Sequence, residues 1–169
     1  MAGLIKIINK MNFKKFSQYI VVIIFILIIS FLLINKNKNS ENNFNNFDVK
    51  NTKYVKIGGE IIKVELALTS TDQELGLSIK DNLKNDEGML FIFNNVGIYS
   101  FWMKDMSFPI DIIWIGEDFQ IVFIKKNATE ESFPEIFSPN KNSKYVLEVM
   151  SGFSEKKNLK EGDKVEFLP

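Results

Sequence analysis

The segment Ile110–Ile115, IDIIWI, restricts the fold more than any other part of the chain. Side chains alternate between the two faces of a strand, and here both faces are apolar except at Asp111. A strand that is apolar on both faces is typical of a sheet covered on both sides. We therefore expect a central strand here, with the carboxyl group of Asp111 at or near a core position.

Short apolar or alternating segments on both sides of this strand predict a β-rich α+β fold for residues 54–169. A two-glycine turn, Gly58-Gly59, is expected to join the first two strands as a hairpin. The domain is expected to be compact, built on a single sheet or barrel-like, with one or two short helices. Strands are expected at residues 54–57, 60–68, 88–93, 99–104, 110–115, 119–125, 145–150 and 164–168, and a loop at 127–144.

Two polar patterns predict the short helices. The run from Thr71 to Glu74 fits a capping box at a helix start, and Gly76 is placed to end that helix. Ser154 is expected to cap a helical turn that reaches Leu159.

Residues 19–34, YIVVIIFILIISFLLI, form an apolar run without a charged residue. As a helix with a rise of ~1.5 Å per residue the run is about 24 Å long, slightly short of the ~30 Å hydrocarbon core of a bilayer. Lysines on both sides have flexible stems that extend the span. We predict a transmembrane helix here that anchors the chain in the lipid bilayer and precedes the domain. A cleaved signal peptide is the alternative, but no pair of small residues at A-x-A spacing follows the run.

The flanking charges predict the orientation of this anchor. Residues 1–18 carry four lysines and no acid, whereas two lysines, Lys36 and Lys38, follow the run directly. The positive-inside rule then places a basic N-terminus, residues 1–18, in the cytoplasm. The chain is therefore predicted to be a single-pass protein of the cell membrane with its globular domain outside the cytoplasm.

The rest of the chain divides by composition. Residues 35–53 contain eight asparagines among nineteen residues, which predicts a polar linker with too few apolar side chains to fold. Residues 54–169 carry thirteen lysines and nineteen acids, a net charge of −6. An acidic domain argues against nucleic acid as a partner, because nucleic-acid binding needs clustered basic residues.

Cysteine, histidine and arginine are absent from the chain. This composition excludes a thiolate nucleophile, a histidine base and a metal site of the Cys or His type. Carboxylates alone bind Ca²⁺ or Mg²⁺, but no EF-hand spacing is present. We therefore expect neither a metal site nor a cofactor.

Three acids lie on otherwise apolar strand faces: Asp111, Glu148 and, less clearly, Glu65. A buried carboxylate is costly unless it is paired or hydrogen-bonded, and Lys104 is the natural cation because it follows the apolar FWM segment. The hypothesis is one polar cluster of these four side chains. The alternative is that each carboxylate ties down loop N–H groups. Trp102, beside the cluster, is a candidate platform for a flat ligand such as a sugar.

Four segments in this order resemble a known family: GMLFIF at 88–93, FWMK at 101–104, PIDI at 109–112 and YVLE at 145–148. From about residue 55 to 167 the chain is similar to the family called domain of unknown function 192. The resemblance implies a compact β-rich fold, often behind an N-terminal signal or anchor, and no agreed activity. The polar positions of the family pattern fall on Glu65, Lys104, Asp111, Glu148 and Asp163.

The chain departs from that pattern near its predicted first helix. The family usually has an arginine where Leu75 stands. If that arginine normally pairs with an acid, the pairing is either lost here or taken over by a lysine such as Lys80, and a site shared by the family is expected to be altered in this chain.

Three functions are compatible with these features. The first is a membrane-anchored binding or accessory module at the cell envelope, with an envelope glycan or a protein as its partner. The second is a hydrolase or transferase that acts on an envelope glycan through two carboxyl groups, Asp111 with Glu148 or Asp105. The third is an interaction domain without a small ligand.

Overall fold

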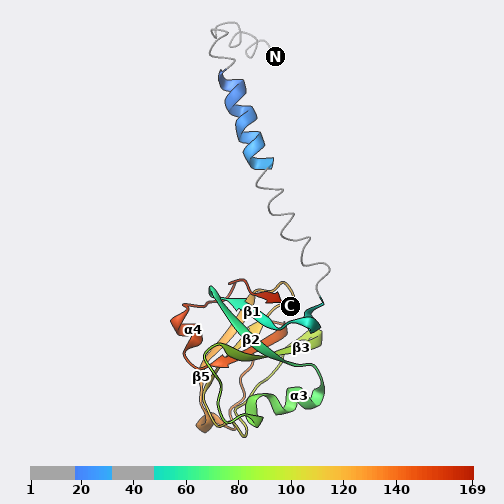
Figure 1. Cartoon of the computed structure of the whole chain (residues 1–169), viewed down its shortest axis with the longest axis vertical. Coiled ribbons are helices and arrows are strands. Elements are labelled where there is room, and N and C mark those ends of the chain that lie inside the picture. The colour runs from blue at the N-terminus through green and yellow to red at the C-terminus, as the bar shows by residue number, and fades with distance from the viewer. Residues whose placement is uncertain (1–17, 32–47) are drawn as a thin grey trace. The chain divides into compact units, whose positions relative to one another are not determined.

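The computed structural model describes residues 18–31 and 48–169, and the chain divides into two units at Phe47 and Asp48. Residues 18–31 form a helix, blue in Figure 1, whose large apolar side chains are exposed. Among the residues that the structure describes, no helix is both long and apolar enough to cross a membrane. Residues 1–17, 32–34 and 35–47 of the predicted N-terminus, anchor and linker lie outside the described residues, so these three segments stay predictions.

The second unit, Asp48–Pro169, is a β-rich half-barrel built on one seven-stranded sheet (Figure 1). The strand order is β5-β4-β6-β3-β2-β1-β7, and only the β2–β3 pair is parallel. The helices are short, so the predicted β-rich fold with short helices is confirmed. The strands are β1 Tyr54–Ile57, β2 Glu60–Ala67, β3 Glu87–Gly97, β4 Ile110–Ile115, β5 Ile121–Ala128, β6 Ser143–Met150 and β7 Glu166–Leu168. The helices are η1 Val49–Asn51, α3 Ser70–Leu75, η2 Gly76–Ile79, η3 Glu130–Ser132 and α4 Phe153–Lys156.

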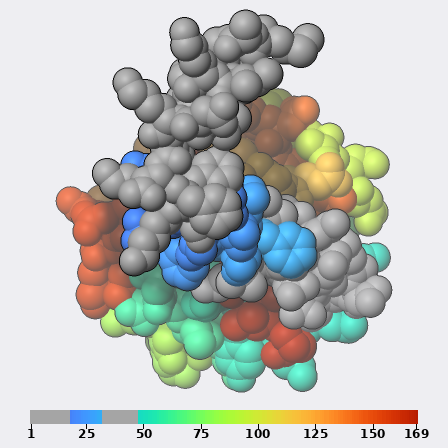
Figure 2. Space-filling view, turned by 90° about the horizontal axis from the view of Figure 1, so that it is seen from above, coloured from blue at the N-terminus to red at the C-terminus, as the bar shows by residue number. Residues whose placement is uncertain are grey.

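The curvature of the sheet brings its two ends together. At one end β1 pairs with β7, seen as teal beside red in Figure 2. At the other end Gln120 forms a bridge with Lys164, just before β7. The N–H of Val165 also donates to the carbonyl of Phe119, at 2.9 Å. These bonds close much of the gap between the two edges, which explains the barrel-like character expected from the sequence.

The β1–β2 hairpin follows from its turn. Ile57 pairs with Glu60, so Gly58 and Gly59 alone make the connection. Their φ angles are 56° and 81°, and a two-residue turn with positive φ at both positions favours glycine. The predicted hairpin is confirmed.

The capping box of α3 lies two residues before the predicted one. Thr69 is the N-cap: its Oγ1 accepts from the N–H of Asp72 at 3.1 Å, and Oδ2 of Asp72 accepts from the N–H of Thr69 at 3.1 Å. Several residues of this segment are able to cap a helix. The prediction that the capping box begins at Thr71 was wrong. Gly76, with φ 51°, ends the helix as predicted.

Two other local predictions were wrong. Residues 99–104 do not form a regular strand, since only Phe101 makes a bridge, with Phe137. Ser154 does not cap a helix, because α4 already begins at Phe153 behind Gly152. The Ser154 N–H is instead used by a buried carboxylate described below.

Both faces of the sheet are covered at β4, as its sequence predicts, because all six β4 residues are buried. Each fully buried large apolar side chain contributes roughly 1.5–3 kcal/mol relative to its exposed state. On one face lie Ala67, Met89, Phe91, Ile112, Trp114 and Val146. On the other lie Leu90, Ile92, Ile113, Ile115, Tyr145 and Leu147.

Candidate functional site

Glu148 lies in the middle of the sheet, on the face that carries Phe91 and Trp114. Glu148 belongs to β6, and its partners on the two flanking strands are Ile112 of β4 and Met89 of β3. The residue is 4% exposed, and its Oε2 has no hydrogen-bond partner among the described residues. Burial raises the pKa of the Glu148 carboxyl group to about 8. At neutral pH the group is therefore mostly protonated.

The Glu148 side chain lines an open pocket of about 170 Å³. The pocket lies between α3 with η2 on one side and the segment 99–106 on the other. Five aromatic side chains contribute to its lining: Phe91, Phe93, Tyr99, Phe101 and Trp102. Trp102 is 50% exposed, which makes it the accessible member of this set. We call this cavity the Glu148 pocket.

The aromatic side chains pack on one another and on the core beneath. The rings of Phe93 and Tyr99 are stacked, with centroids 3.5 Å apart. Phe91 meets Phe101 edge to face at 4.9 Å, and Phe101 meets Trp114 in the same way at 5.6 Å. Such pairs add about 0.5–1.5 kcal/mol to the burial of the rings. The aromatic wall is therefore continuous with the core.

Hydrogen bonds hold the loop that carries this wall. The indole N–H of Trp114 donates to the carbonyl of Tyr99 at 2.8 Å. Phe101 and Phe137 exchange two backbone hydrogen bonds, of 2.9 and 2.8 Å. The hydroxyl groups of Ser100 and Ser138 are 2.7 Å apart. These contacts position Trp102 at the mouth of the pocket without a regular strand.

Gly76 brings the backbone close to the carboxyl group from the other side. A Cβ atom at this position would lie 3.4 Å from Cζ of Phe91 and 3.7 Å from Oε2 of Glu148. The residue also has a positive φ, 51°, which side chains of L-residues rarely adopt. The backbone turn at Gly76, at the end of α3, therefore packs against the Glu148 carboxyl group.

Asp111 lies on the opposite face of the sheet. Asp111 of β4 pairs with Val149 of β6, whereas Glu148 of β6 pairs with Ile112 of β4. Successive residues of a strand point to opposite faces, so Asp111 and Glu148 do too. The Asp111 residue is fully buried, and its carboxylate accepts three backbone N–H bonds. The donors are Asn127 at 2.9 Å, Gly152 at 3.3 Å and Ser154 at 2.7 Å. Asp111 therefore ties the end of β5 to the start of α4, as the alternative reading of a buried strand carboxylate predicts.

The predicted four-residue cluster is thus divided. Lys104 and Trp102 line the Glu148 pocket, so these two join Glu148. The Lys104 side chain is 53% exposed, and its ion pair with Asp105 is long, 3.9 Å. Asp111 is separated from them by the sheet.

Sequence reasoning missed Glu74, Phe93 and Tyr99 as lining residues. Glu74 is an exposed residue on α3, and its sequence neighbourhood resembles any solvated helix surface. The two aromatic residues were assigned to the predicted strands at 88–93 and 99–104. The alternation of Phe91 and Phe93 on β3 places them on one face and is the signal that a pocket on that face would involve both.

A protein-family model for domain of unknown function 192 (DUF192), described as "Uncharacterized ACR, COG1430", matches residues 53–167. The chain belongs to the DUF192 family. The resemblance seen in the sequence is therefore confirmed, over nearly the same residues.

Two solved structures are similar to this DUF192 chain. A "putative transcription regulator" from Sinorhizobium meliloti 1021 is 30% identical with a TM-score of 0.63, and the match covers 68% of this chain and 92% of that one. A protein of unknown function from Novosphingobium aromaticivorans DSM 12444 is 32% identical with a TM-score of 0.61, and the match covers 67% and 83%. No curated protein matches the chain.

The position where the DUF192 pattern usually has arginine borders the pocket. Leu75, which stands there, is 44% exposed and lines the pocket. Lys80 pairs with an acid, which is one of the two alternatives that the sequence left open, and that acid is Glu65: the Lys80 Nζ lies 2.6 Å from Glu65 Oε1. Glu65 is on the same face as Glu148, with Met89 between them. Its carboxylate is already engaged and does not line the pocket.

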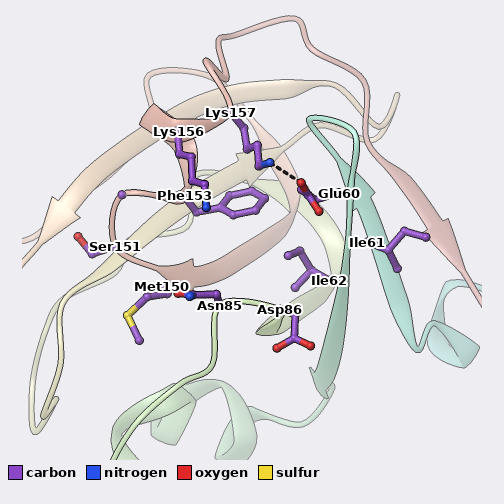
Figure 3. A pocket seen from close by; sticks show the side chains of 11 residues that line it. Glu60, Ile61, Ile62, Asn85, Asp86, Met150, Ser151, Phe153, Lys156 and Lys157 are labelled. Carbon is purple, nitrogen blue, oxygen red and sulfur yellow. Dashed lines mark hydrogen bonds and ion pairs between the residues drawn. The ribbon is translucent and has the colours of Figure 1, made fainter.

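A second, larger pocket of about 330 Å³ lies between β2, the end of β6 and α4 (Figure 3). Ile62 and Phe153 supply apolar lining, and Lys157 donates to Glu60 across it. The lysine neighbour lowers the pKa of the Glu60 carboxyl group through this hydrogen bond. Its charged groups are exposed or paired, so this pocket lacks the buried, unpaired group that distinguishes the Glu148 pocket.

The described residues contain no group of three acids arranged to hold a metal ion. The lining of the Glu148 pocket combines the buried carboxyl group of Glu148, five aromatic side chains and two charged residues, Glu74 and Lys104.

Proposed function

We propose that this DUF192 chain is a membrane-tethered binding module of the cell envelope whose ligand site is the Glu148 pocket. The observation that carries the proposal is the buried carboxyl group of Glu148, which has an oxygen without a partner and faces an open aromatic cavity. An aromatic pocket with a few polar groups of shifted pKa is the usual form of a small-ligand site.

Glu148 contributes nothing to the fold that an apolar residue would not. A buried polar atom without a hydrogen bond costs about 1–3 kcal/mol, and the neighbouring Met89 and Ile112 show that the surroundings suit an apolar side chain. Asp111 differs from Glu148 in this respect, because its carboxylate accepts hydrogen bonds from three backbone N–H groups. The unpaired group therefore favours a role in binding over a role in folding.

The two-carboxylate hydrolase hypothesis has weaker support. It requires two carboxyl groups on one substrate, separated by ~5–10 Å. Asp111 and Glu148 point to opposite faces of the sheet, so they do not form such a pair. Asp105, the other acid considered, has a side chain 76% exposed and lies beside Lys104. A binding module accounts for Glu148 with one carboxyl group.

The description of one relative as a transcription regulator does not extend to this proposal. Residues 54–169 have a net charge of −6, and a DNA-binding surface needs clustered lysine or arginine.

The membrane tether predicts the location of the domain. The apolar run at 19–34 and the four lysines before it support an anchor with the C-terminus outside the cytoplasm. A reporter enzyme active only outside the cytoplasm, fused after Pro169, is expected to be active. The matched control is a reporter active only in the cytoplasm at the same junction, expected to be silent. The reverse result would contradict the tether and leave the pocket unaffected.

The pocket predicts a ligand response at Trp102. The chain has two tryptophans, and Trp114 is fully buried with its indole N–H bonded, so only Trp102 is open to a ligand. The full-length protein in a non-ionic detergent is screened by NMR of the two indole N–H groups against monosaccharides, small aromatic compounds and alkylammonium salts at millimolar concentration. At least one class is expected to shift the Trp102 signal and to leave the Trp114 signal in place.

Phe133→Ala is the matched control for this screen, since Phe133 is an exposed aromatic side chain outside the pocket, 45% exposed. It should leave the ligand response unchanged, whereas Trp102→Ala, followed by a thermal shift with the same ligand, should remove it. If no class shifts Trp102 in a folded protein, the small-ligand proposal fails and the interaction-domain hypothesis is favoured.

A further inference from the structure

We infer that the ligand of the Glu148 pocket is an organic cation, an alkylammonium or quaternary ammonium group held between the aromatic wall and the Glu148 carboxylate. This inference rests on the proposed function and specifies its ligand class. Three features of the described residues support it: the aromatic wall, the acids, and the hydrogen bonds that already engage Gln73, Tyr99 and Ser100.

The aromatic wall suits a cation. Five aromatic side chains line a cavity of about 170 Å³. An aromatic ring attracts a cation placed over its face, with about 0.5–2 kcal/mol per contact, and several rings around one site form the usual cage for quaternary ammonium groups. The same chemistry occurs elsewhere in this chain, where the ammonium group of Lys125 lies 4.2 Å from the ring centre of Phe137.

The acids in the pocket supply the opposite charge. Glu148 stands among the aromatic residues with an unpartnered oxygen, and Glu74 of α3 lines the same cavity. A bound cation would pair with the Glu148 carboxylate in a site where water does not compensate the charge. A neutral ligand would leave that carboxyl group without a charged partner.

Three polar side chains of the pocket are already engaged, which makes it less suited to a sugar. The side-chain amide of Gln73 donates to the carbonyl groups of Ala67 and Ile92, both at 3.2 Å. The Tyr99 hydroxyl donates to the carbonyl of Asn95 at 2.6 Å, and the Ser100 hydroxyl is paired with Ser138. A sugar ring needs several free donors and acceptors, whereas an ammonium group needs a carboxylate and aromatic faces.

Lys104 is the one cation in the lining and opposes a second positive charge. Its side chain is 53% exposed and has Asp105 as a counter-ion, so it lies at the rim and not beside the buried carboxyl group. Burial is the cause of the Glu148 pKa shift, and a lysine close to the carboxylate would instead lower that pKa.

Binding of a cation is expected to release a proton from Glu148. The other titratable groups that face the pocket are Glu74 on α3 and Tyr99 and Lys104 on the loop. Along the sheet, the strand neighbours Met89 and Ile112 carry no charge. The next residues in that row are Glu65, paired with Lys80, and Lys125. Glu148 is thus the acid whose proton an ammonium ion displaces, and affinity should rise with pH up to about 8.

The test compares choline with its neutral carbon analogue, 3,3-dimethylbutan-1-ol, on the full-length protein in a non-ionic detergent. Binding is followed through the Trp102 indole signal. Choline is expected to bind at least about tenfold more tightly than the neutral analogue. Its affinity should increase by up to about tenfold per pH unit between pH 6 and 8, since one proton is displaced.

Two variants with the same change of charge separate Glu148 from the general acidity of the domain. Glu148→Gln should weaken choline binding at least about tenfold and remove the pH dependence. Glu65→Gln, on the same face but outside the pocket, should change neither. Both variants are checked for folding by the chemical shift of the Trp114 indole N–H, which should stay at its wild-type position.

The outcomes distinguish this inference from the proposed function. Equal binding of choline and its neutral analogue, or unchanged binding in Glu148→Gln, would overturn the cation inference and keep the pocket as a ligand site. A Trp102 response to a sugar or a neutral aromatic compound, without a response to choline, would do the same. Silence of Trp102 toward every class would overturn both.

Discussion

Replacing Asp111 by alanine is expected to lower the free energy of unfolding by about 4 kcal/mol, because three backbone N–H groups, including that of buried Ser154, lose their acceptor. Hydrogen bonds to a charged group contribute about 1.5–3 kcal/mol each, and an orphaned buried donor costs about 1–3 kcal/mol. Small domains are stable by about 5–15 kcal/mol, so the variant retains little of the native state. Urea unfolding followed by the fluorescence of the buried Trp114 measures the loss.

The effect should be local in origin. Asp111 bonds Asn127 at the end of β5 and the Gly152 and Ser154 N–H groups at the start of α4, so these two segments should lose protection from hydrogen exchange first. Asp111→Asn keeps one acceptor oxygen and should lose less stability than the alanine variant.

Asp105→Asn is the matched control for Asp111. Its side chain is 76% exposed, and its positive φ of 57° is one that asparagine tolerates, so its stability should change by less than about 0.5 kcal/mol. An Asp111→Ala variant as stable as this control would show that the three N–H bonds contribute little, and the assignment of Asp111 to the fold would be wrong.

The central part of the fold was predictable because its signals are local and strong. A strand that is apolar on both faces, such as Ile110–Ile115, has few places in a small domain other than the middle of a covered sheet. Gly58-Gly59 leaves little choice but a two-residue turn. The same reasoning predicted buried carboxyl groups at Asp111 and Glu148, since their sequence neighbours are apolar.

The errors come from features that depend on distant partners. Residues 99–104 have the composition of a strand, yet their backbone bonds go to the Trp114 indole and to Phe137, which the sequence does not pair with them. Thr69, Thr71 and Asp72 are all able to cap a helix, and the choice depends on where β2 ends.

The division of the predicted polar cluster has a similar cause. Whether Asp111 and Glu148 share a face depends on the register between β4 and β6. A shift by one residue reverses the answer, and neither strand's own pattern defines that register. The sequence therefore indicates which carboxyl groups are buried, but the pairing of the strands decides which of them reaches a pocket.

The second large effect is a pH-dependent gain of stability in Glu148→Gln. The pKa of Glu148 is raised from 4.5 to about 8 by burial, so the folded state binds a proton that the unfolded state releases between these pH values. The wild-type protein then loses about 1.4 kcal/mol per pH unit across this window, up to about 5 kcal/mol in total. Below pH 4.5 both states are protonated and the term vanishes; above pH 8 both are ionised and the loss is complete.

Glutamine has nearly the same shape and does not ionise, so the difference in stability between Glu148→Gln and the wild type should be small and constant below pH 4.5. It should then grow in favour of the variant up to pH 8 and level off above it. Urea unfolding from pH 4 to 9 measures this difference, in which the pH dependence of all other groups cancels.

Glu65→Gln is the matched control, because the Glu65 side chain is 62% exposed and paired with Lys80. The stability difference between Glu65→Gln and the wild type should not follow this curve. A flat difference for Glu148→Gln would mean that the carboxylate is ionised and compensated in the folded protein. The ligand site would then lose the buried, unpaired group on which its chemistry depends.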